Sequence, residues 1–271
     1  MSLIPKKHFG QHFLNDPVIA QKIVNCLTNN ASDKVLEIGP GKGALTKFLI
    51  KKRSKIKLIE IDQDAITILQ KKFPKTEIIN TDFLKLDLSS IGWNKYVIIG
   101  NFPYNISTQI LFRILENRDN IVEVVGMFQK EVGDRICSSN NSKKYGIPSV
   151  LLQAFFKCEK LFDVSPEKFE PIPKVNSSVI KLTRNNTTDL GCNYVKFEQI
   201  VKMCFSQRRK KIKNALKNFI NLVDSDAEGL SSKRAEQLTV SEFIDLTNAI
   251  LKIQNEFSTD KRVSRNNQST H

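Results

Sequence analysis

Short apolar runs alternate with amphipathic segments over the first two-thirds of the chain. The runs are rich in β-branched residues and predict buried strands, at residues 34–39, 56–61, 77–80, 96–100, 121–128 and 178–183. Apolar residues at helical spacing predict helices between them, at residues 44–52, 64–72 and 108–116. Alternation of this kind favours an α/β fold with a parallel sheet and right-handed crossovers.

The pattern changes at a polar stretch, residues 185–191, beyond which the strand signal disappears. Apolar side chains then recur at helical spacing: Phe197, Ile200, Val201, Cys204 and Phe205, then Ile212, Leu216 and Phe219, then the segment 241–253. We therefore predict a sheet domain over residues 1–184, a small all-α domain over 194–257 and a disordered tail over 258–271. The polar segment 138–144 is a predicted loop, and its composition leaves open whether it acts as a lid.

The charge of the chain departs from that of an ordinary soluble protein. Its 271 residues carry a formal net charge of +14, and such an excess favours a polyanionic partner. Five cysteines are scattered without a C-x-x-C pair, which argues against a zinc site or a disulfide framework and favours the cytoplasm. With only three histidines, no metal centre is expected. Neither a signal peptide nor a membrane-spanning run is predicted.

A glycine-rich turn joins the first predicted strand to the first predicted helix. It reads E-I-G-P-G-K-G over residues 37–43, and Pro40 removes an amide that a pyrophosphate could use. Glu37 adds negative charge, which favours a cationic ligand such as the sulfonium of S-adenosylmethionine. Glu60 lies about 20 residues after the glycines, the distance at which an acidic residue binds ribose hydroxyls. Asp82 follows the third strand, where its carboxylate can accept a hydrogen bond from an adenine amine.

The motif N-F-P-Y at residues 101–104 follows the fourth predicted strand, at the sheet edge where ligands bind in α/β folds. The Asn101 amide and the Pro103 carbonyl can accept hydrogen bonds from an amino group, and the Tyr104 ring can stack on a base. A plain β-turn is the alternative, because Asn and Pro are common turn residues. Four residues at successive strand ends favour an S-adenosylmethionine site, namely Gly39, Glu60, Asp82 and Asn101.

Cationic residues crowd one segment of the predicted helical domain, with no acidic residue between Lys202 and Lys217. We predict that six of them contact RNA phosphates, which set register rather than sequence. The six are Lys202, Arg208, Arg209, Lys210, Lys211 and Lys213. A solvated helical face without a nucleic-acid role is the alternative.

Motifs spread along the chain together resemble the ribosomal RNA adenine dimethyltransferases, and among them the KsgA (RsmA) type. The resemblance runs from about residue 6 to about residue 253. It rests on F-G-Q-H-F-L (9–14), E-I-G-P-G-K-G (37–43), N-F-P-Y (101–104), Q-K-E-V (129–132), Y-G (145–146), F-E-P-I-P-K-V (169–175), F-S-Q-R-R-K (205–210) and R-A-E (234–236). The last two favour this type over the methyltransferases that modify large-subunit RNA.

The resemblance implies a class I methyltransferase fold, a Rossmann-like sheet with helices on both faces, followed by the all-α domain. It carries cofactor contacts onto His12, Leu14, Gly39, Glu60, Asp82 and Asn101. Two positions depart from the family pattern. His12 stands where the family usually has Asn, and its ring is bulkier, and Phe102 stands where the family has Leu.

The resemblance further implies N6,N6-dimethylation of two adjacent adenosines in a hairpin loop near the 3′ end of small-subunit (16S) rRNA. Asn101 and Pro103 would then hold the amine, and Tyr104 and Phe169 would stack the flipped base, with core packing as an equal alternative for Phe169. The expected partner is the immature small ribosomal subunit, and the protein is expected to act as a monomer. A non-catalytic assembly factor, a large-subunit methyltransferase and a factor recruited to organellar transcription are the competing functions.

Overall fold

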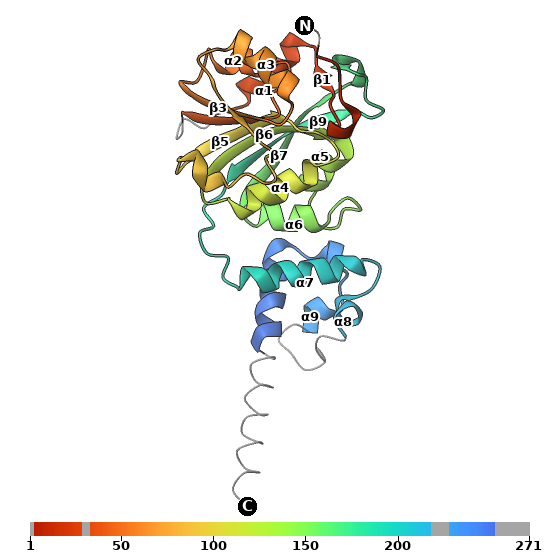
Figure 1. Cartoon of the computed structure of the whole chain (residues 1–271). Helices are drawn as coiled ribbons and strands as arrows, with labels where there is room; N and C mark the ends of the chain where they lie inside the picture. Colours follow the sequence, from red (N-terminus) through yellow and green to blue (C-terminus); the bar gives the residue numbers. More distant parts are fainter. Residues whose placement is uncertain (1–2, 29–32, 218–227, 253–271) are drawn as a thin grey trace, which may run out of the picture. The chain divides into compact units, whose positions relative to one another are not determined.

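The computed structural model describes residues 3–28, 33–217 and 228–252 (Figure 1). The chain forms two compact units. The sheet unit comprises Met1–Cys137 and Phe155–Asn185, and the helical unit comprises Ser138–Ala154 and Asn186–His271. The helical unit thus includes residues 138–154, which precede the last three strands of the sheet unit in the sequence. The predicted tail lies outside the described residues.

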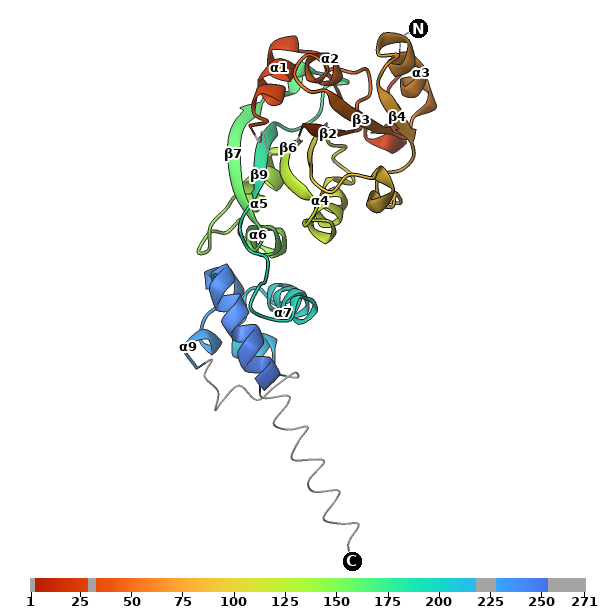
Figure 2. The ribbon, with the colours of Figure 1, turned by 90° about the vertical axis from the view of Figure 1, so that its left-hand side faces the viewer.

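The sheet unit is built on seven strands in the order β4-β3-β2-β5-β6-β9-β7. Their bounds are β2 Lys34–Ile38, β3 Lys55–Glu60, β4 Glu77–Asn80, β5 Tyr96–Asn101, β6 Ile121–Gln129, β7 Phe156–Val164 and β9 Ser177–Arg184. The first five strands of that order are parallel, as the alternation predicted. The prediction was wrong for β9, which runs antiparallel between β6 and β7 (Figure 2).

Helices cover both faces of this sheet. Figure 1 shows α1–α3 on one face and α4 and α5 on the other. Their bounds are α1 Pro17–Asn25, α2 Thr46–Leu49, α3 Gln63–Lys72, α4 Ser107–Glu116 and α5 Lys130–Ile136. The helix α2 is shorter than the predicted 44–52, because hydrogen-bonded turns continue on both sides of it. Asp16 precedes α1 and caps its first turn. Its carboxylate accepts hydrogen bonds from the N–H groups of Val18 and Ile19.

The strand that ends in the N-F-P-Y motif lies in the middle of this sheet. Five of the six residues of β5 are buried, which explains a continuous apolar run, since both faces of a central parallel strand are covered. One core cluster joins β2, β5 and β6 to α1 and α2, and it includes Ile23, Val35, Leu49, Val97 and Val125. A rigid centre therefore carries the loops at the strand ends.

A second, two-stranded sheet brings the N-terminal arm to the main sheet unit. It pairs β1 (Phe13–Leu14) with β8 (Phe169–Glu170) in antiparallel register. Three short 3-10 helices complete the sheet unit, at Lys7–Phe9, Leu88–Ile91 and Pro166–Lys168. The arm, residues 6–13, is thereby fixed at its C-terminal end.

The helical unit contains α6 (Ile147–Gln153), α7 (Tyr194–Ser206), α8 (Ile212–Ala215), α9 (Glu228–Ser231), a 3-10 turn (Ala235–Gln237) and a helix over 240–252. As predicted, α7 buries one face, formed by Phe197, Ile200, Val201 and Cys204. Phe205 is only partly buried and lies against the rings of Tyr145 and Phe243. Phe219 and Ile253, which the apolar pattern also included, lie outside the described residues.

The loop at 138–144 is tied to this unit by hydrogen bonds. The N–H of Asn141 donates to the carbonyl of Glu236 at 2.7 Å, and the Asn140 amide donates to the carbonyl of Gln237 at 3.1 Å. The guanidinium of Arg208 donates to the carbonyl of Ser142 at 3.2 Å. The loop is therefore anchored inside the helical unit.

Candidate active site

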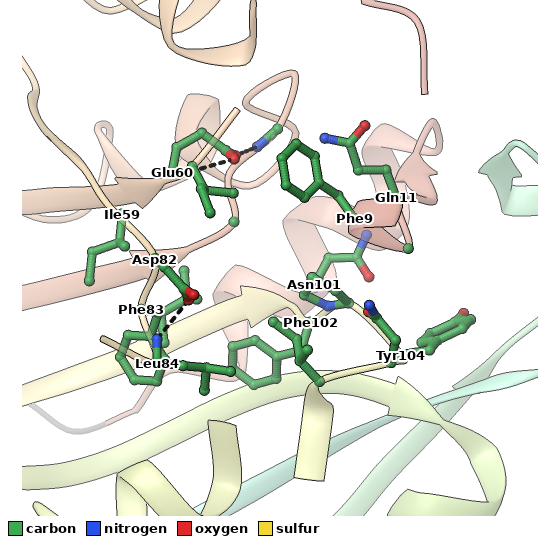
Figure 3. A pocket seen from close by; sticks show the side chains of 18 of the residues that line it. Phe9, Gln11, Ile59, Glu60, Asp82, Phe83, Leu84, Asn101, Phe102 and Tyr104 are labelled. Carbon is green, nitrogen blue, oxygen red and sulfur yellow. Dashed lines mark hydrogen bonds between the residues drawn. The ribbon is translucent and has the colours of Figure 1, made fainter. Parts of the chain in front are cut away.

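A cavity lies at the carboxyl ends of the central parallel strands. Its walls come from β2, β3 and β5, from the segment after β4 and from arm residues 8–13. Figure 3 shows Glu60 and Asp82 on one side of this cavity and Gln11 and Tyr104 on the other. The structure thus brings together the strand-end residues that the sequence singled out, at the edge where ligands bind in α/β sheets.

The glycine turn is held to β3 through Glu60. One oxygen of this carboxylate accepts the N–H of Gly41 at 3.0 Å, and the other accepts those of Ile61 and Asp62 at 2.9 and 3.0 Å. Burial raises the pKa of Glu60, although these three backbone hydrogen bonds oppose the shift. A carboxylate offers about four acceptor positions, so Glu60 keeps acceptor capacity for a ligand hydroxyl.

Two of the three glycines of the turn fulfil different requirements. Gly39 has a φ of +64° and open space where a Cβ would lie, so its backbone borders the cavity directly. Gly41 has a φ of +54°, and a Cβ there would lie 2.9 Å from the ring of Phe13. Positive φ values and close approach are the conditions that require glycine.

Glu37, which precedes the glycine turn, is buried. Its side chain is 1% exposed and accepts a hydrogen bond from the Thr46 hydroxyl at 2.7 Å. Burial raises the pKa of Glu37 to about 8, and the neighbouring Glu60 adds to the shift. Burial therefore favours the neutral carboxyl, whereas the sequence predicted a negative charge at this turn.

The segment after β4 contributes a carboxylate and a ring to the cavity. One oxygen of Asp82 accepts the N–H of Leu84 at 2.9 Å, which fixes the side chain in a tight turn (Figure 3). Phe83 is buried beside it and lines the same cavity. A carboxylate next to an apolar ring suits the amino edge and the face of an adenine.

Asn101 ends β5, and its amide is oriented by the arm. The Asn101 Nδ2 donates to the backbone carbonyl of His12 at 2.7 Å, so the amide oxygen is the atom left to accept a hydrogen bond. The His12 Nδ1 lies 2.7 Å from the carbonyl of Pro171. The backbone carbonyl of His12 thus orients Asn101, and the Nδ1 of its ring contacts the Pro171 carbonyl.

Tyr104 is held at its hydroxyl and on one face. Its hydroxyl lies 2.6 Å from that of Ser177, and the His12 ring stacks on it with centroids 5.3 Å apart and planes 26° apart. Burial raises the pKa of the Tyr104 phenol, opposed by the Ser177 hydrogen bond. The Pro103 carbonyl already accepts the N–H of Ile106 at 3.2 Å and keeps its second lone pair.

Two predicted site residues lie in the core. Phe169 is 3% exposed and Leu14 is 6% exposed, and both belong to the cluster that packs against α1 and β2. Phe169 does not line the cavity, so the structure favours core packing for this ring over base stacking. Leu14 borders a smaller hollow beside the glycine turn, together with Asn101, which is compatible with a backbone or apolar contact to a ligand.

The six predicted RNA-binding cations fall into two groups. Lys202 pairs with Glu198 at 2.7 Å, and Arg208 pairs with Glu236 at 3.1 Å. The pair of Lys202 lies within α7 and leaves Lys202 exposed, whereas the pair of Arg208 joins two segments of the helical unit. The other four are exposed, and they are Arg209, Lys210, Lys211 and Lys213.

Sequence reasoning missed two residues that support the site. Ser177 starts β9 and anchors the hydroxyl of Tyr104, and no local signal marks it. Asp62 caps α3 and binds the arm through Gln11. Asp62 could have been noticed from the sequence, because it is an acidic residue two positions after Glu60. None of the described helices is long and apolar enough to cross a membrane.

Comparisons with known proteins agree with this geometry. A family model described as ribosomal RNA adenine dimethylase matches residues 4–252. A protein of Cytophaga hutchinsonii named ribosomal RNA small subunit methyltransferase A is 54% identical over 250 residues, 90% of this chain and 96% of that protein. Its namesake in Flavobacterium johnsoniae is 51% identical over 249 residues, with 90% and 95% covered.

Solved structures support the same assignment. A dimethyladenosine transferase from Plasmodium falciparum has a TM-score of 0.76 at 27% identity, with 90% of this chain and 98% of that chain covered. The 23S rRNA methyltransferase ErmE has a TM-score of 0.69 at 23% identity, with 88% and 99% covered, which is a likeness of fold. The predicted class I methyltransferase fold and the resemblance are confirmed, and the chain belongs to the ribosomal RNA adenine dimethylase family.

Proposed function

We propose that the protein is an S-adenosylmethionine-dependent N6,N6-dimethyltransferase of two adjacent adenosines in a hairpin loop near the 3′ end of small-subunit rRNA. We further propose that it acts as a cytoplasmic monomer on the immature small subunit. The observation that carries the proposal is the orientation of Asn101, whose amide nitrogen is bound by His12 while its oxygen remains to accept an amine. The names of the relatives support the choice of subunit.

The residues of the cavity fit S-adenosylmethionine. Gly39 leaves open space where a side chain would stand, and Glu60 has acceptor capacity beyond its three backbone contacts. Asp82 and Phe83 offer an acceptor and an apolar face for an adenine ring. Glu60 would hold the ribose and Asp82 the adenine amine, while Gly39 gives the backbone its close approach.

Two acceptors at the end of β5 suit the amine of a target adenine. The oxygen of Asn101 and the second lone pair of the Pro103 carbonyl can each accept one N6 hydrogen. The lone pair of that amine is conjugated with the ring, and hydrogen bonds that fix both hydrogens favour the geometry in which the lone pair is free. After one methyl transfer a single hydrogen remains, so one acceptor suffices to hold the amine for the second.

Orientation is the main contribution of these side chains to the reaction. When bound, S-adenosylmethionine supplies a methyl group that passes from its sulfonium to N6 with loss of an N6 proton. Asn101 and Pro103 aim the nitrogen, and orientation of this kind can contribute up to about 7–11 kcal/mol in ideal cases. Tyr104, fixed by Ser177 and His12, offers its ring to the base, and such stacking contributes roughly 1–3 kcal/mol.

The exposed cations of the helical unit supply attraction to the RNA backbone. Four of them lie close together in the sequence, at Arg209, Lys210, Lys211 and Lys213. Phosphate contacts position an RNA without reading its sequence, and they make affinity depend steeply on salt. The proposal therefore assigns chemistry to the sheet unit and electrostatic binding to the helical unit.

The test is transfer of a tritiated methyl group from S-adenosylmethionine to ribosomal particles. We expect label in small subunits that lack the modification, and none in large subunits. Label confined to large-subunit RNA would support the competing methyltransferase function. Tight binding to small subunits without any label would support the non-catalytic assembly factor, and either result would refute the proposal.

A further inference from the structure

The start of the N-terminal arm is bound to the sheet unit by the buried carboxylate of Asp62 and by the exposed carboxylate of Asp64, which lies 2.7 Å from the Lys6 ammonium. The Oδ1 of Asp62 accepts a hydrogen bond from the ammonium of Lys6 at 2.5 Å, and its Oδ2 accepts one from the Gln11 amide at 2.9 Å. The Gln11 amide oxygen in turn accepts the N–H of Lys6 at 2.8 Å. Two arm residues and one carboxylate thus form a closed set of hydrogen bonds.

The carboxylate of Asp62 is fully covered, whereas its cation is not. The Asp62 side chain is 0% exposed and that of Lys6 is 32% exposed. Burial opposes ionisation of Asp62, but the hydrogen bonds from Lys6, Gln11 and the N–H of Asp64 together lower its pKa. A buried charge with satisfied partners holds its neighbours in one geometry, because losing a partner leaves the charge uncompensated.

Asp62 also touches the wall of the cavity. Its N–H donates to Glu60 at 3.0 Å, so the carboxylate that binds the arm lies in the same turn as the residue proposed to bind the ribose. Arm residues 8–13 line the cavity between this turn and the N-F-P-Y motif. At the far end, Asn101 binds the carbonyl of His12. The arm therefore crosses the cavity and is attached on both sides.

We propose that Asp62 is a positioning residue that latches the arm over the cofactor cavity through Lys6 and Gln11. The latch sets how long a bound nucleoside cofactor stays, and it holds His12 where it orients Asn101. The inference rests on the proposed function, since it takes the cavity to hold S-adenosylmethionine and its product S-adenosylhomocysteine.

A purely structural role for Asp62 is the competing explanation. Its Oδ1 also accepts the N–H of Asp64 at 3.1 Å and so caps α3. Substitution of Asp62 itself would disturb both the helix and the arm. Lys6→Met leaves the cavity lining and the cap in place, and Gln11→Met also keeps the cap but changes one lining side chain, so Lys6→Met is the variant that separates the two roles.

The experiment measures release of S-adenosylhomocysteine from the full-length protein by stopped-flow displacement, and cleavage of the arm by trypsin after Lys7. The variants are Lys6→Met, Lys6→Arg and Lys6→Met/Gln11→Met. Lys57→Met is the matched control, because Lys57 lies on β3, the strand that leads to Asp62, and pairs with Glu77 of β4 at 2.9 Å and with the carbonyl of Ile91, all outside the arm. Thermal unfolding of each variant monitors the fold.

We expect Lys6→Met to raise the dissociation rate about fivefold, as loss of a partly exposed ion pair predicts. The double variant should raise it roughly tenfold or more and speed arm cleavage, with association unchanged. Lys6→Arg and Lys57→Met should stay within about twofold of the parent. Parent-like release and cleavage in a folded double variant would overturn the latch alone. Failure of the parent to bind S-adenosylhomocysteine would overturn the proposed function and the retention role with it.

Discussion

The cavity of the sheet unit and the cationic surface of the helical unit hold their polar side chains in opposite ways. In the cavity, Glu60 has three backbone partners and Asn101 is oriented by the arm. On the helical unit, Arg209 and Lys210 project into solvent. Chemistry on one atom needs fixed directions, whereas attraction to phosphates needs only charge in roughly the right place.

The comparison also shows that the cations of one basic run differ in their partners. Lys202 and Arg208 belong to the basic run, yet both pair with carboxylates of their own unit. Arg208 further supports the loop at 138–144 through Ser142. The two motifs that favoured the small-subunit type, Q-R-R-K and R-A-E, meet in the pair Arg208–Glu236.

Asn101→Ala is the sharpest test of the cavity, where side chains are held in fixed orientations. We expect single-turnover methyl transfer to fall by about 10²–10³-fold, the usual cost of removing one oriented polar group at a reacting centre. RNA binding should stay unchanged. Asn80→Ala is the control, because Asn80 also ends a strand and its amide donates to Gln63 outside the cavity at 2.9 Å. Unimpaired transfer by Asn101→Ala would remove this residue from the reaction.

The role of the helical unit is tested by replacing four of its exposed cations with Gln in one variant. The four are Arg209, Lys210, Lys211 and Lys213. RNA affinity at low salt should fall by about 10–100-fold, and the slope of log K against log salt should flatten by up to roughly 3. The control removes the same charge from the sheet unit by Lys47, Lys51, Lys52 and Lys55→Gln, which are all exposed. Equal losses in both variants would mean that net charge matters and its position does not.

Glu37 tests whether a buried carboxyl of the sheet unit is neutral. Its pKa of about 8 lies above the ordinary 4.5, so its contribution to stability is complete below 4.5 and is lost as pH rises to about 8. The slope is at most about 1.4 kcal/mol per pH unit. Glu37→Gln should flatten this part of the curve when urea unfolding is followed from pH 5 to 8. An unchanged slope would show that Glu37 is ionised throughout.

The smallest expected effect separates two neighbouring arginines. Arg208→Gln should cost about 1 kcal/mol of unfolding free energy, because it loses partly solvated contacts to Glu236 and Ser142. Arg209→Gln should change stability by less than about 0.5 kcal/mol while weakening RNA binding. Urea unfolding and RNA titration on both variants check the division. Equal destabilisation by the two substitutions would contradict it.

Much of the sheet could be predicted because its central strands are buried on both faces. Continuous apolar runs identify β2, β5 and β6. The strand β7 was missed because it lies at the sheet edge and pairs with β9 alone. Most of its residues are at least partly exposed, so the run contains lysines and acidic residues. Strand direction is equally invisible to periodicity, which is why the antiparallel β9 was unexpected.

The candidate site divides in the same way. Gly39, Glu60, Asp82 and Asn101 could be found because strand ends and glycine turns have local signals. The raised pKa of Glu37 could not be predicted, since it depends on burial by distant residues. Phe169 lies in a motif yet packs in the core. Ion pairs between residues far apart in sequence, such as Arg208 with Glu236, require the tertiary fold.

The central claim is that the β5 edge directs two methyl groups onto N6 of adenines in small-subunit rRNA. Nucleoside mass spectrometry of unmodified small subunits, incubated with the protein and S-adenosylmethionine, tests it most directly. The account predicts N6,N6-dimethyladenosine at two adjacent positions near the 3′ end, with the parent protein and not with Asn101→Ala. Methylation of another atom, or dimethyladenosine formed equally by Asn101→Ala, would contradict it.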